Sequence, residues 1–263
     1  MDLHLQDKVV IVTGASAGIG YAIVEAFARE GTQVVAASRH TASLEKLAQQ
    51  YPVLLVAADL STAQGTQALV TKALTTHRRI DVLVNNAGIF ESRQGFLSIS
   101  DEDWQRTLST NFMSVVRLSR AILPVMVEQK SGVILNVASE SARQPDTNLI
   151  DYSVSKAALV MLSKALANEF GPQGIRVNTV SPGPTYTAQW DQPGGFADHL
   201  AQTYGLDREA AIEHFVKNVR QLPTQRMGTP EDVAAVLVFL ASDLARQITG
   251  SDYAVNGGSI RAA

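Results

Sequence analysis

The sequence of 263 residues contains no cysteine. This absence excludes a disulfide framework, a thiolate nucleophile and a cysteine-ligated zinc or iron–sulfur site. Charge is also sparse: 18% of the residues are charged, the formal net charge is −3, and no run is rich in lysine and arginine. Nothing in such a chain would follow a phosphate backbone, so we expect no nucleic acid partner and a chemistry built from oxygen and nitrogen groups.

Long hydrophobic runs are missing as well. The longest apolar stretch, 233–241, is far too short to span a bilayer, and the polar N-terminus lacks the apolar segment of a signal peptide. The five histidines show no metal-ligand spacing; they are His4, His40, His77, His199 and His214. We therefore expect a cytoplasmic protein with no membrane contact and no catalytic metal.

Short apolar runs are what the chain does contain, since 46% of its residues are hydrophobic. Six runs rich in Val, Ile and Leu each predict a buried strand, at 9–12, 34–37, 53–57, 82–84, 133–137 and 175–180. Helical spacing between them indicates an α/β fold with a parallel sheet covered on both faces. No repeat or linker divides the chain, so we predict one domain over 1–263. The apolar excess over charge also favours a homo-oligomer.

The clearest helix is predicted over 151–170. Its apolar periodicity predicts a core face, formed by Val154, Ala157, Ala158, Met161, Leu162, Ala165 and Leu166. A second apolar strip of Leu159, Val160 and Ala167 indicates that the helix is buried on two sides, one of them against a second subunit. The irregular segment 186–229 is predicted to be a partly helical lid, with Asp207 capping an amphipathic stretch.

A glycine-rich turn follows the first predicted strand and opens a helical pattern. Glycines let the backbone approach a pyrophosphate, which the free N–H groups and positive end of the helix would hold. The spacing is G-x-x-x-G-x-G, and a tight strand-to-helix turn without a ligand is the plain alternative. Its position predicts a dinucleotide site, with contacts from Gly14, Ser16, Gly18, Ile19 and Gly20.

The choice of dinucleotide depends on the end of the second strand. An acidic residue there would bind a ribose 2′-hydroxyl, whereas an arginine accommodates a 2′-phosphate. The sequence has Ser38 and Arg39, and 31–44 holds no Asp or Glu, so NADP(H) is favoured over NAD(H). Arg39 is alternatively a solvated surface charge. Asp59 and Leu60, after the third strand, would face the adenine, unless Asp59 only caps the next helix.

The order of motifs resembles the short-chain dehydrogenase/reductase family, in particular its ketoreductases. The resemblance spans nearly the whole chain, and its motifs are 13–20, Asn85-Asn86-Ala87-Gly88, Asn111, Ser139, Tyr152-x-x-x-Lys156, Ser181-Pro182-Gly183, Arg226-x-Gly228-x-Pro230-Glu231-Asp232-Val233-Ala234, Ile248-Thr249-Gly250 and Gly257-Gly258. It implies a doubly wound Rossmann-type sheet of about seven strands. It also implies a dimer or tetramer.

The chemistry of carbonyl reduction points to the same residues. A developing alkoxide needs a proton donor and a group that holds its oxygen, roles that suit Tyr152 and Ser139. A phenol has a pKa of about 10, so it needs a nearby cation, and Lys156 lies one helical turn away. Each of these residues taken singly is also compatible with a structural role.

The family resemblance implies further contacts. Asn111 would hold a water that links Lys156 to solvent, and Lys156 would bind the nicotinamide ribose. Other expected cofactor contacts are Asn86, Gly88, Pro182, Gly183, Thr185 and Thr187. Glu140, directly after the serine, departs from the family pattern and would place a charge near the substrate mouth. Tyr186, Trp190 and Phe196 form either an aromatic wall of the substrate pocket or simple packing.

We therefore predict an NADP(H)-dependent oxidoreductase that reduces a ketone, or oxidises the corresponding secondary alcohol, with Tyr152 as acid and base. One alternative is an NAD-dependent alcohol or sugar dehydrogenase, in which Arg39 has no role. A second is a regulator that binds NADP(H) without turnover. The partner is a small carbonyl or alcohol molecule, whose identity stays open among thioesters, steroid-like ketones, diketones and sugars.

Overall fold

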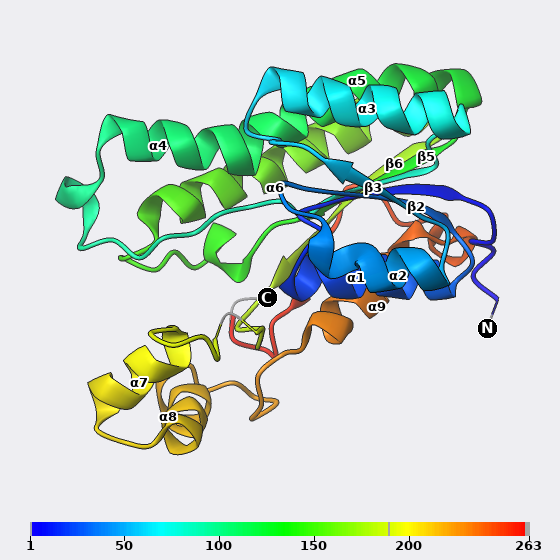
Figure 1. The fold of residues 1–263 in the computed structure, drawn as a ribbon. Helices are drawn as coiled ribbons and strands as arrows, with labels where there is room; N and C mark the ends of the chain where they lie inside the picture. Colours follow the sequence, from blue (N-terminus) through cyan, green and yellow to red (C-terminus); the bar gives the residue numbers. More distant parts are fainter. Residues whose placement is uncertain (1, 189, 261–263) are drawn as a thin grey trace.

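The computed structural model describes residues 2–188 and 190–260. Its centre is a parallel sheet of seven strands in the order β3-β2-β1-β4-β5-β6-β7 (Figure 1). The predicted α/β fold and all six predicted strands are confirmed. The strands are β1 (Val9–Thr13), β2 (Gln33–Ser38), β3 (Val53–Ala57), β4 (Val82–Asn85), β5 (Gly132–Val137), β6 (Ile175–Pro182) and β7 (Asp252–Val255).

Helices cover both faces of this sheet (Figure 1). One layer holds α1 (Gly18–Arg29), α2 (Glu45–Gln50) and α9 (Pro230–Ala241). The other holds α3 (Ala63–His77), α4 (Asp101–Leu108), α5 (Ser114–Gln129) and α6 (Ile150–Phe170), with a π-helical turn, Ser109–Met113, between α4 and α5. None of the helices in the described parts of the chain is long and apolar enough to cross a membrane.

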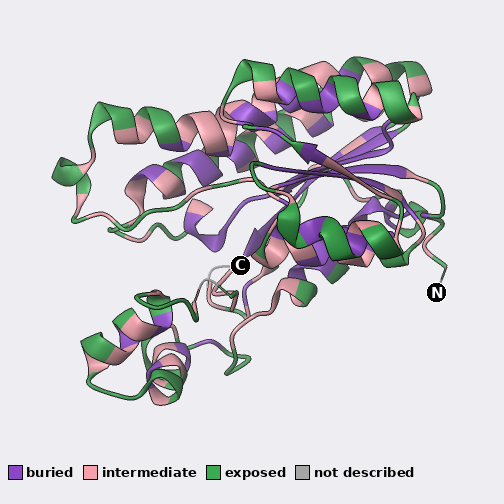
Figure 2. Cartoon of the chain, in the orientation of Figure 1, coloured by how far each residue is buried: buried purple, intermediate pink, exposed green. Residues whose placement is uncertain are grey.

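The central strands are apolar because both of their faces are covered. Every residue of β1 is buried. Val10 and Val12 belong to the core cluster beneath α1 and α9, whereas Val9 and Ile11 belong to the cluster beneath α3 and α5. Since successive side chains of a strand point to opposite faces, a continuous run of Val and Ile serves both layers. Figure 2 shows this burial concentrated in the strands.

The strand order reverses between β1 and β4. These two strands pair in parallel, with Val10 opposite Val82 and Val12 opposite Val84, but their chain connections run to opposite sides of the sheet. The loops that follow β1 and β4 therefore separate, and a crevice opens at the carboxyl ends of the strands, where open α/β sheets bind their ligands.

The predicted core face of α6 is wrong. Val154 is 47% and Met161 is 71% exposed, whereas Leu159 and Ser163 on the opposite face are buried. The amide of Asn136 on β5 donates to Ser163 Oγ at 2.8 Å. This helix packs closely on the sheet through small and polar side chains, so its apolar periodicity marks the outward face. The buried residues of α6 are Asp151, Ser153, Ser155, Lys156, Leu159, Ser163 and Ala167.

The predicted lid segment, 186–229, stands apart from the two helical layers (Figure 1). It contains α7 (Phe196–Tyr204), α8 (Arg208–His214) and a π-helical turn, Phe215–Val219. The predicted cap is confirmed, because Asp207 Oδ1 accepts a hydrogen bond from the backbone N–H of Ala210 at 2.9 Å. Helix α7 was not expected from the sequence. Its few apolar residues follow two glycines that indicate a loop.

Candidate active site

The glycine turn after β1 has the geometry of an anion cradle. Gly14 and Gly18 have φ angles of +64° and +51°, and a Cβ on Gly20 would lie 2.0 Å from the carbonyl oxygen of Gly14. The helix α1 starts here with Ala17 at its N-cap, a residue without a side-chain oxygen to bind the first N–H groups. Those groups and the helix dipole are available to an anion. The turn therefore fits a dinucleotide pyrophosphate.

One cleft of about 1300 Å³ runs from this turn to Tyr152 and Ser139. It follows the carboxyl edge of the sheet, so strand-end residues from distant parts of the sequence face it. All residues predicted to bind the cofactor line it: Gly14, Ser16, Gly18, Ile19, Gly20, Ser38, Arg39, Asp59, Leu60, Asn86, Gly88, Tyr152, Lys156, Pro182, Gly183, Thr185 and Thr187. Among the described residues, no group of three or more His, Asp or Glu side chains is placed to hold a metal ion.

Asn86 fixes the floor of the cleft beside the glycine turn. Its side-chain amide donates to the carbonyl oxygens of Thr13 at 3.0 Å and Gly14 at 3.2 Å, which ties the end of β4 to the end of β1. A Cβ on Gly14 would lie 2.8 Å from Ala87 Cα. The two loops at the reversal point therefore pack backbone against backbone, and only glycine fits there.

The far end of the cleft carries Arg39 and Asp59, both exposed. Hydrogen bonds from the hydroxyl (2.7 Å) and N–H (3.0 Å) of Ser61 lower the pKa of Asp59, and the charge of Arg39 adds to this. The interpretation of Asp59 as the helix cap is wrong. Thr62 caps α3, because its hydroxyl accepts from the N–H of Gly65 at 3.0 Å. Asp59 instead orders the turn that leads to this cap.

Ser139, Tyr152 and Lys156 meet at the other end of the cleft. The Lys156 ammonium group donates to the carbonyl oxygen of Val137 at 2.8 Å and lies 5.6 Å from the centre of the Tyr152 ring. Burial raises the pKa of Tyr152, and a hydrogen bond with Ser139 partly opposes this. Burial also lowers the pKa of Lys156 to about 8. A phenol, an ammonium group and a second hydroxyl thus lie close together, as the sequence predicted.

Asn111 lies behind the wall of the cleft, in the π-helical turn between α4 and α5. It is fully buried. Its amide donates to the carbonyl oxygen of Ile89 at 2.9 Å and to Ser155 Oγ at 3.1 Å, and its oxygen accepts from the N–H of Ile89 at 2.8 Å. This side chain therefore joins the loop after β4 to α6. π-Helical turns are frequent at functional sites.

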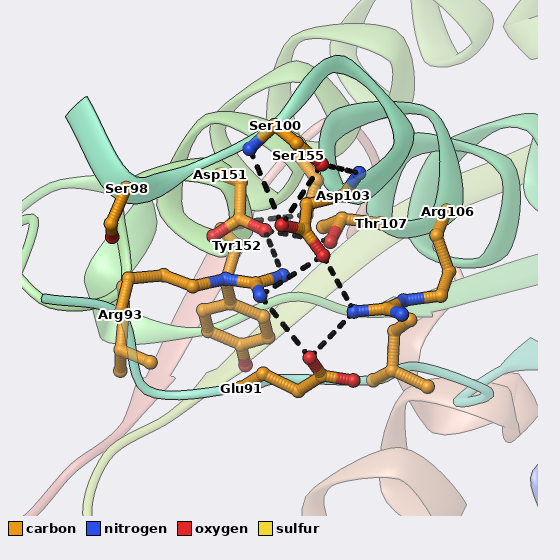
Figure 3. A network of polar contacts seen from close by, with 12 residues as sticks. Glu91, Arg93, Ser98, Ser100, Asp103, Arg106, Thr107, Asp151, Tyr152 and Ser155 are labelled. Carbon is orange, nitrogen blue, oxygen red and sulfur yellow. Dashed lines mark hydrogen bonds and ion pairs between the residues drawn. The ribbon is translucent and has the colours of Figure 1, made fainter. Parts of the chain in front are cut away.

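A network of ion pairs holds the first turn of α6 (Figure 3). Arg93 contacts Asp151 at 3.0 Å, and the hydroxyl of Thr107 donates to the same carboxylate at 2.8 Å. Burial raises the pKa of Asp151, but the hydrogen bonds from Thr107 and Arg93 outweigh it and keep that pKa low. Asp151 directly precedes Tyr152, so the network fixes the backbone position from which the Tyr152 side chain extends. Sequence reasoning missed it, because scattered loop charges form no pattern.

The substrate end of the cleft, which is the end expected to take the substrate beside Ser139, combines charge with aromatic rings. Glu140 is buried there, and its carboxylate bonds to Arg220, which follows the second π-helical turn. The Glu140 carboxylate thus lines the cleft directly beside Ser139, whereas Arg220 and its second partner Asp146 were not predicted. Trp190 and Phe196 both line the cleft and pack on each other, with ring centres 4.6 Å apart, whereas Tyr186 packs on Trp190 and is not among the lining residues.

Known proteins resemble this chain over its full length. Residues 14–259 match the family model described as enoyl-(acyl carrier protein) reductase. The uncharacterised oxidoreductase YvrD of Bacillus subtilis is 39% identical over 99% of both chains. A D-threitol dehydrogenase of Mycolicibacterium smegmatis is 34% identical over 98% of this chain and 94% of its own length.

Among solved structures, the L-sorbose reductase of Gluconobacter frateurii in complex with NADPH and L-sorbose has a TM-score of 0.93. It is 35% identical, with 100% of both chains covered. The fold, the cleft and these similarities agree with one another. The chain belongs to the short-chain dehydrogenase/reductase family, oxidoreductases that act on CH–OH and C=O groups.

Proposed function

We propose that this oxidoreductase uses NADPH to reduce a ketone to a secondary alcohol, and catalyses the reverse reaction with NADP⁺. The observation that carries the proposal is the single cleft that joins the glycine turn to Ser139, Tyr152 and Lys156. A dinucleotide laid along it has its phosphates at α1 and its other end beside the phenol. The segment 186–229 would close over the substrate end as a lid.

When bound, NADPH supplies the hydride that forms the new C–H bond at the carbonyl carbon. Ser139 Oγ donates a hydrogen bond to the carbonyl oxygen and holds it beside Tyr152. The Tyr152 hydroxyl transfers its proton to that oxygen, which forms the alcohol O–H bond and leaves a phenolate. The Lys156 ammonium group stabilises this phenolate, since an opposite charge nearby favours the ionised form.

The phenolate must regain a proton before the next turnover. Asn111 lies beside Lys156, since a Cβ on Gly88 would be 3.5 Å from both Asn111 Oδ1 and Lys156 Nζ. A water held at Asn111 would pass a proton from solvent through Lys156 to Tyr152. In the direction of alcohol oxidation, the phenolate takes the proton of the alcohol and the same relay carries it away.

The preference for NADP(H) rests on Arg39. Its guanidinium lies at the carboxyl end of β2, where the ribose 2′-position is bound in this fold. A 2′-phosphate would make charge-assisted hydrogen bonds with it. The NADPH complex of L-sorbose reductase supports this choice. The NAD-linked alternative would leave Arg39 without a role.

A cofactor titration tests this assignment. We expect NADPH to bind at least tenfold more tightly than NADH, about 1.4 kcal/mol, when binding is followed by fluorescence at one salt concentration. We expect Arg39→Asp to reverse the preference, because a carboxylate repels the phosphate and accepts from the 2′-hydroxyl. Equal affinities in the wild type, or an unchanged ratio in the variant, would remove Arg39 from the account.

We also propose that the chain forms a homo-oligomer through α5 and α6. The outward face of α6 exposes Val154 and Met161, and an apolar groove continues from it between the two helices. Monomeric proteins rarely leave such continuous apolar surface in water. The groove is lined by Val116, Leu123, Pro124, Val127, Leu162, Leu166 and Phe170 together with Ser119, Arg120 and Glu169.

A further inference from the structure

A buried cluster of charge forms the polar part of the substrate end. Arg220 contacts Glu140 through one guanidinium nitrogen and Asp146 at 3.3 Å through another. The hydroxyl of Ser259 donates to the second carboxylate oxygen of Glu140. The side chains of Glu140 and Arg220 are only 6% and 17% exposed. Three distant segments of the chain, 140–146, Arg220 and Ser259, therefore meet around the Glu140 carboxylate.

This cluster faces the reacting groups. Glu140, Asp146 and Arg220 all line the cleft that contains Ser139 and Tyr152, and Glu140 is the residue next to Ser139. Two carboxylates against one guanidinium leave a net negative charge when all three are ionised. Such a site disfavours a substrate with a phosphate or carboxylate group, because like charges repel.

Hydroxyl groups suit the cluster better than apolar atoms do. A carboxylate offers about four lone-pair positions, and Asp146 gives only one 3.3 Å contact to Arg220 while its side chain stays 39% exposed. The guanidinium donates hydrogen bonds and the carboxylate accepts them, so the two together can bind a hydroxyl group, which does both. An apolar substrate would take water from these groups without replacing its hydrogen bonds.

Aromatic rings supply the other part of the pocket. Trp190, Phe196 and Phe215 line the same cleft and pack edge to face, with centres 4.6 Å, 5.6 Å and 6.2 Å apart. Their surfaces can pack against C–H groups, while the charged cluster binds O–H groups. A small molecule with both, such as a polyhydroxylated ketone, fits this combination.

We propose that Arg220, with Asp146 and Glu140, makes the enzyme selective for uncharged ketones that carry hydroxyl groups beside the carbonyl. This inference rests on the proposed ketone reduction and names its substrate class. A site built to hydrogen-bond a hydroxyl discriminates strongly against the analogue that lacks it, because its polar groups are then left unpaired. Arg220 is central because it joins both carboxylates.

Two ketones with one carbon skeleton test the selectivity. Erythrulose carries hydroxyls on three of its four carbons, and butan-2-one carries none. With NADPH, we expect the wild-type kcat/KM for erythrulose to exceed that for butan-2-one at least about a hundredfold. We also expect dihydroxyacetone to be reduced better than dihydroxyacetone phosphate, because of the negative cluster.

Three variants separate recognition from simple structural support. We expect Arg220→Met and Asp146→Asn each to lower the kcat/KM for erythrulose at least about tenfold more than the kcat/KM for butan-2-one. Lys217→Met is the matched control, since Lys217 lies in the same segment, does not line the cleft and pairs with Glu213 on the exposed surface. It should change neither rate. Asp146→Asn keeps the test valid if Arg220→Met does not fold, because it leaves Glu140 paired.

The outcomes are distinct. A wild-type enzyme that reduces butan-2-one as well as erythrulose would overturn the inference and leave the proposed function standing. Variants that lower both rates equally would also overturn it, because Arg220 would then only hold the fold together. Failure of the proposed function shows elsewhere, as an absence of NADPH and NADH binding in the wild-type titration.

Discussion

Lys156 illustrates at the scale of one residue how burial sets reactivity. Its ammonium group has one backbone carbonyl as a partner, and removal from water lowers its pKa to about 8. The charge that we propose supports the Tyr152 phenolate is therefore present at neutral pH but is lost at mildly alkaline pH. Tyr152 itself keeps its proton over this range, because its own pKa is raised.

This pKa predicts a pH profile for the free enzyme. We expect kcat/KM with respect to NADPH, in the direction of ketone reduction, to fall as the pH rises through about 8. The reason is that Lys156 becomes neutral above its pKa and no longer stabilises the phenolate. Lys156→Arg is the control, since a guanidinium stays charged and should remove this inflection. A wild-type profile that is flat to pH 10 would contradict the assignment.

The residues that a sequence can reveal are those with a fixed spacing. Tyr152 and Lys156 are four apart on one helix, and Ser139 follows a clear apolar strand, so their convergence could be predicted. Arg220 could not. It follows an irregular segment, and its partners Glu140 and Asp146 are brought to it only by tertiary packing.

At the scale of the element, α6 illustrates both a correct and an incorrect prediction from the sequence. Its position and length were predicted, but its orientation was not, because its inward face carries Ser155 and Ser163 in place of large apolar side chains. The helix has to lie close to β5 and present Lys156 to the cleft. Apolar periodicity alone therefore identified the surface that faces away from the core.

The strands show the same limit of prediction from apolar patterns. The five inner strands are apolar runs because both of their faces are covered, and the edge strand β3 is an apolar run although most of it is only partly buried. β7 lies at the edge of the sheet and is only partly buried, and its residues, Asp252 to Val255, form no continuous apolar run. Its place in the sheet is set by pairing with β6, in which Thr179 lies opposite Asp252.

The anchor of α6 yields a prediction about stability. Asp151→Ala removes the buried carboxylate that Arg93 and Thr107 share, and breaking a buried pair costs about 3 to 5 kcal/mol. Arg93 keeps Glu91 and Asp103 as partners, so the loss should lie at the lower end of this range. We expect the free energy of unfolding in urea to fall by about 3 kcal/mol, with a lower kcat because Tyr152 is the next residue.

The control for this anchor is Arg106→Ala. Arg106 belongs to the same network in Figure 3, but its side chain is 50% exposed and pairs with Glu91 and Asp103 near the surface. Exposed ion pairs contribute about 1 kcal/mol or less to the free energy of unfolding. If both variants lose the same small amount of stability, the buried pair does not anchor the helix.

At the scale of the whole molecule, the strand order determines where the chemistry takes place. The reversal between β1 and β4 opens the crevice, α1 brings its N-terminus to it, and β5 and α6 bring Ser139 and Tyr152 to its other end. The sequence predicted this arrangement because each motif follows an apolar strand. The lid segment and the polar cluster depend on tertiary contacts that leave no periodic signal.

The outward apolar face of α6 predicts an assembly. We expect light scattering to give a dimer or tetramer for the wild type, and Met161→Glu to shift it toward monomers by burying an unpaired charge in the interface. Leu206→Glu is the control, because Leu206 is 41% exposed on the lid segment, away from α5 and α6. A monomeric wild type would refute the proposed oligomer.

The measurement that tests the central claim most directly compares the wild type with Tyr152→Phe, using NADPH and the ketone that the wild type reduces fastest. The account predicts a loss of about 10² to 10⁴ in kcat, the usual contribution of a general acid. It also predicts an NADPH dissociation constant that stays within about twofold, since the ring is kept and only the proton donor is removed. A variant that binds NADPH normally and still reduces the ketone at a rate near that of the wild type would contradict it.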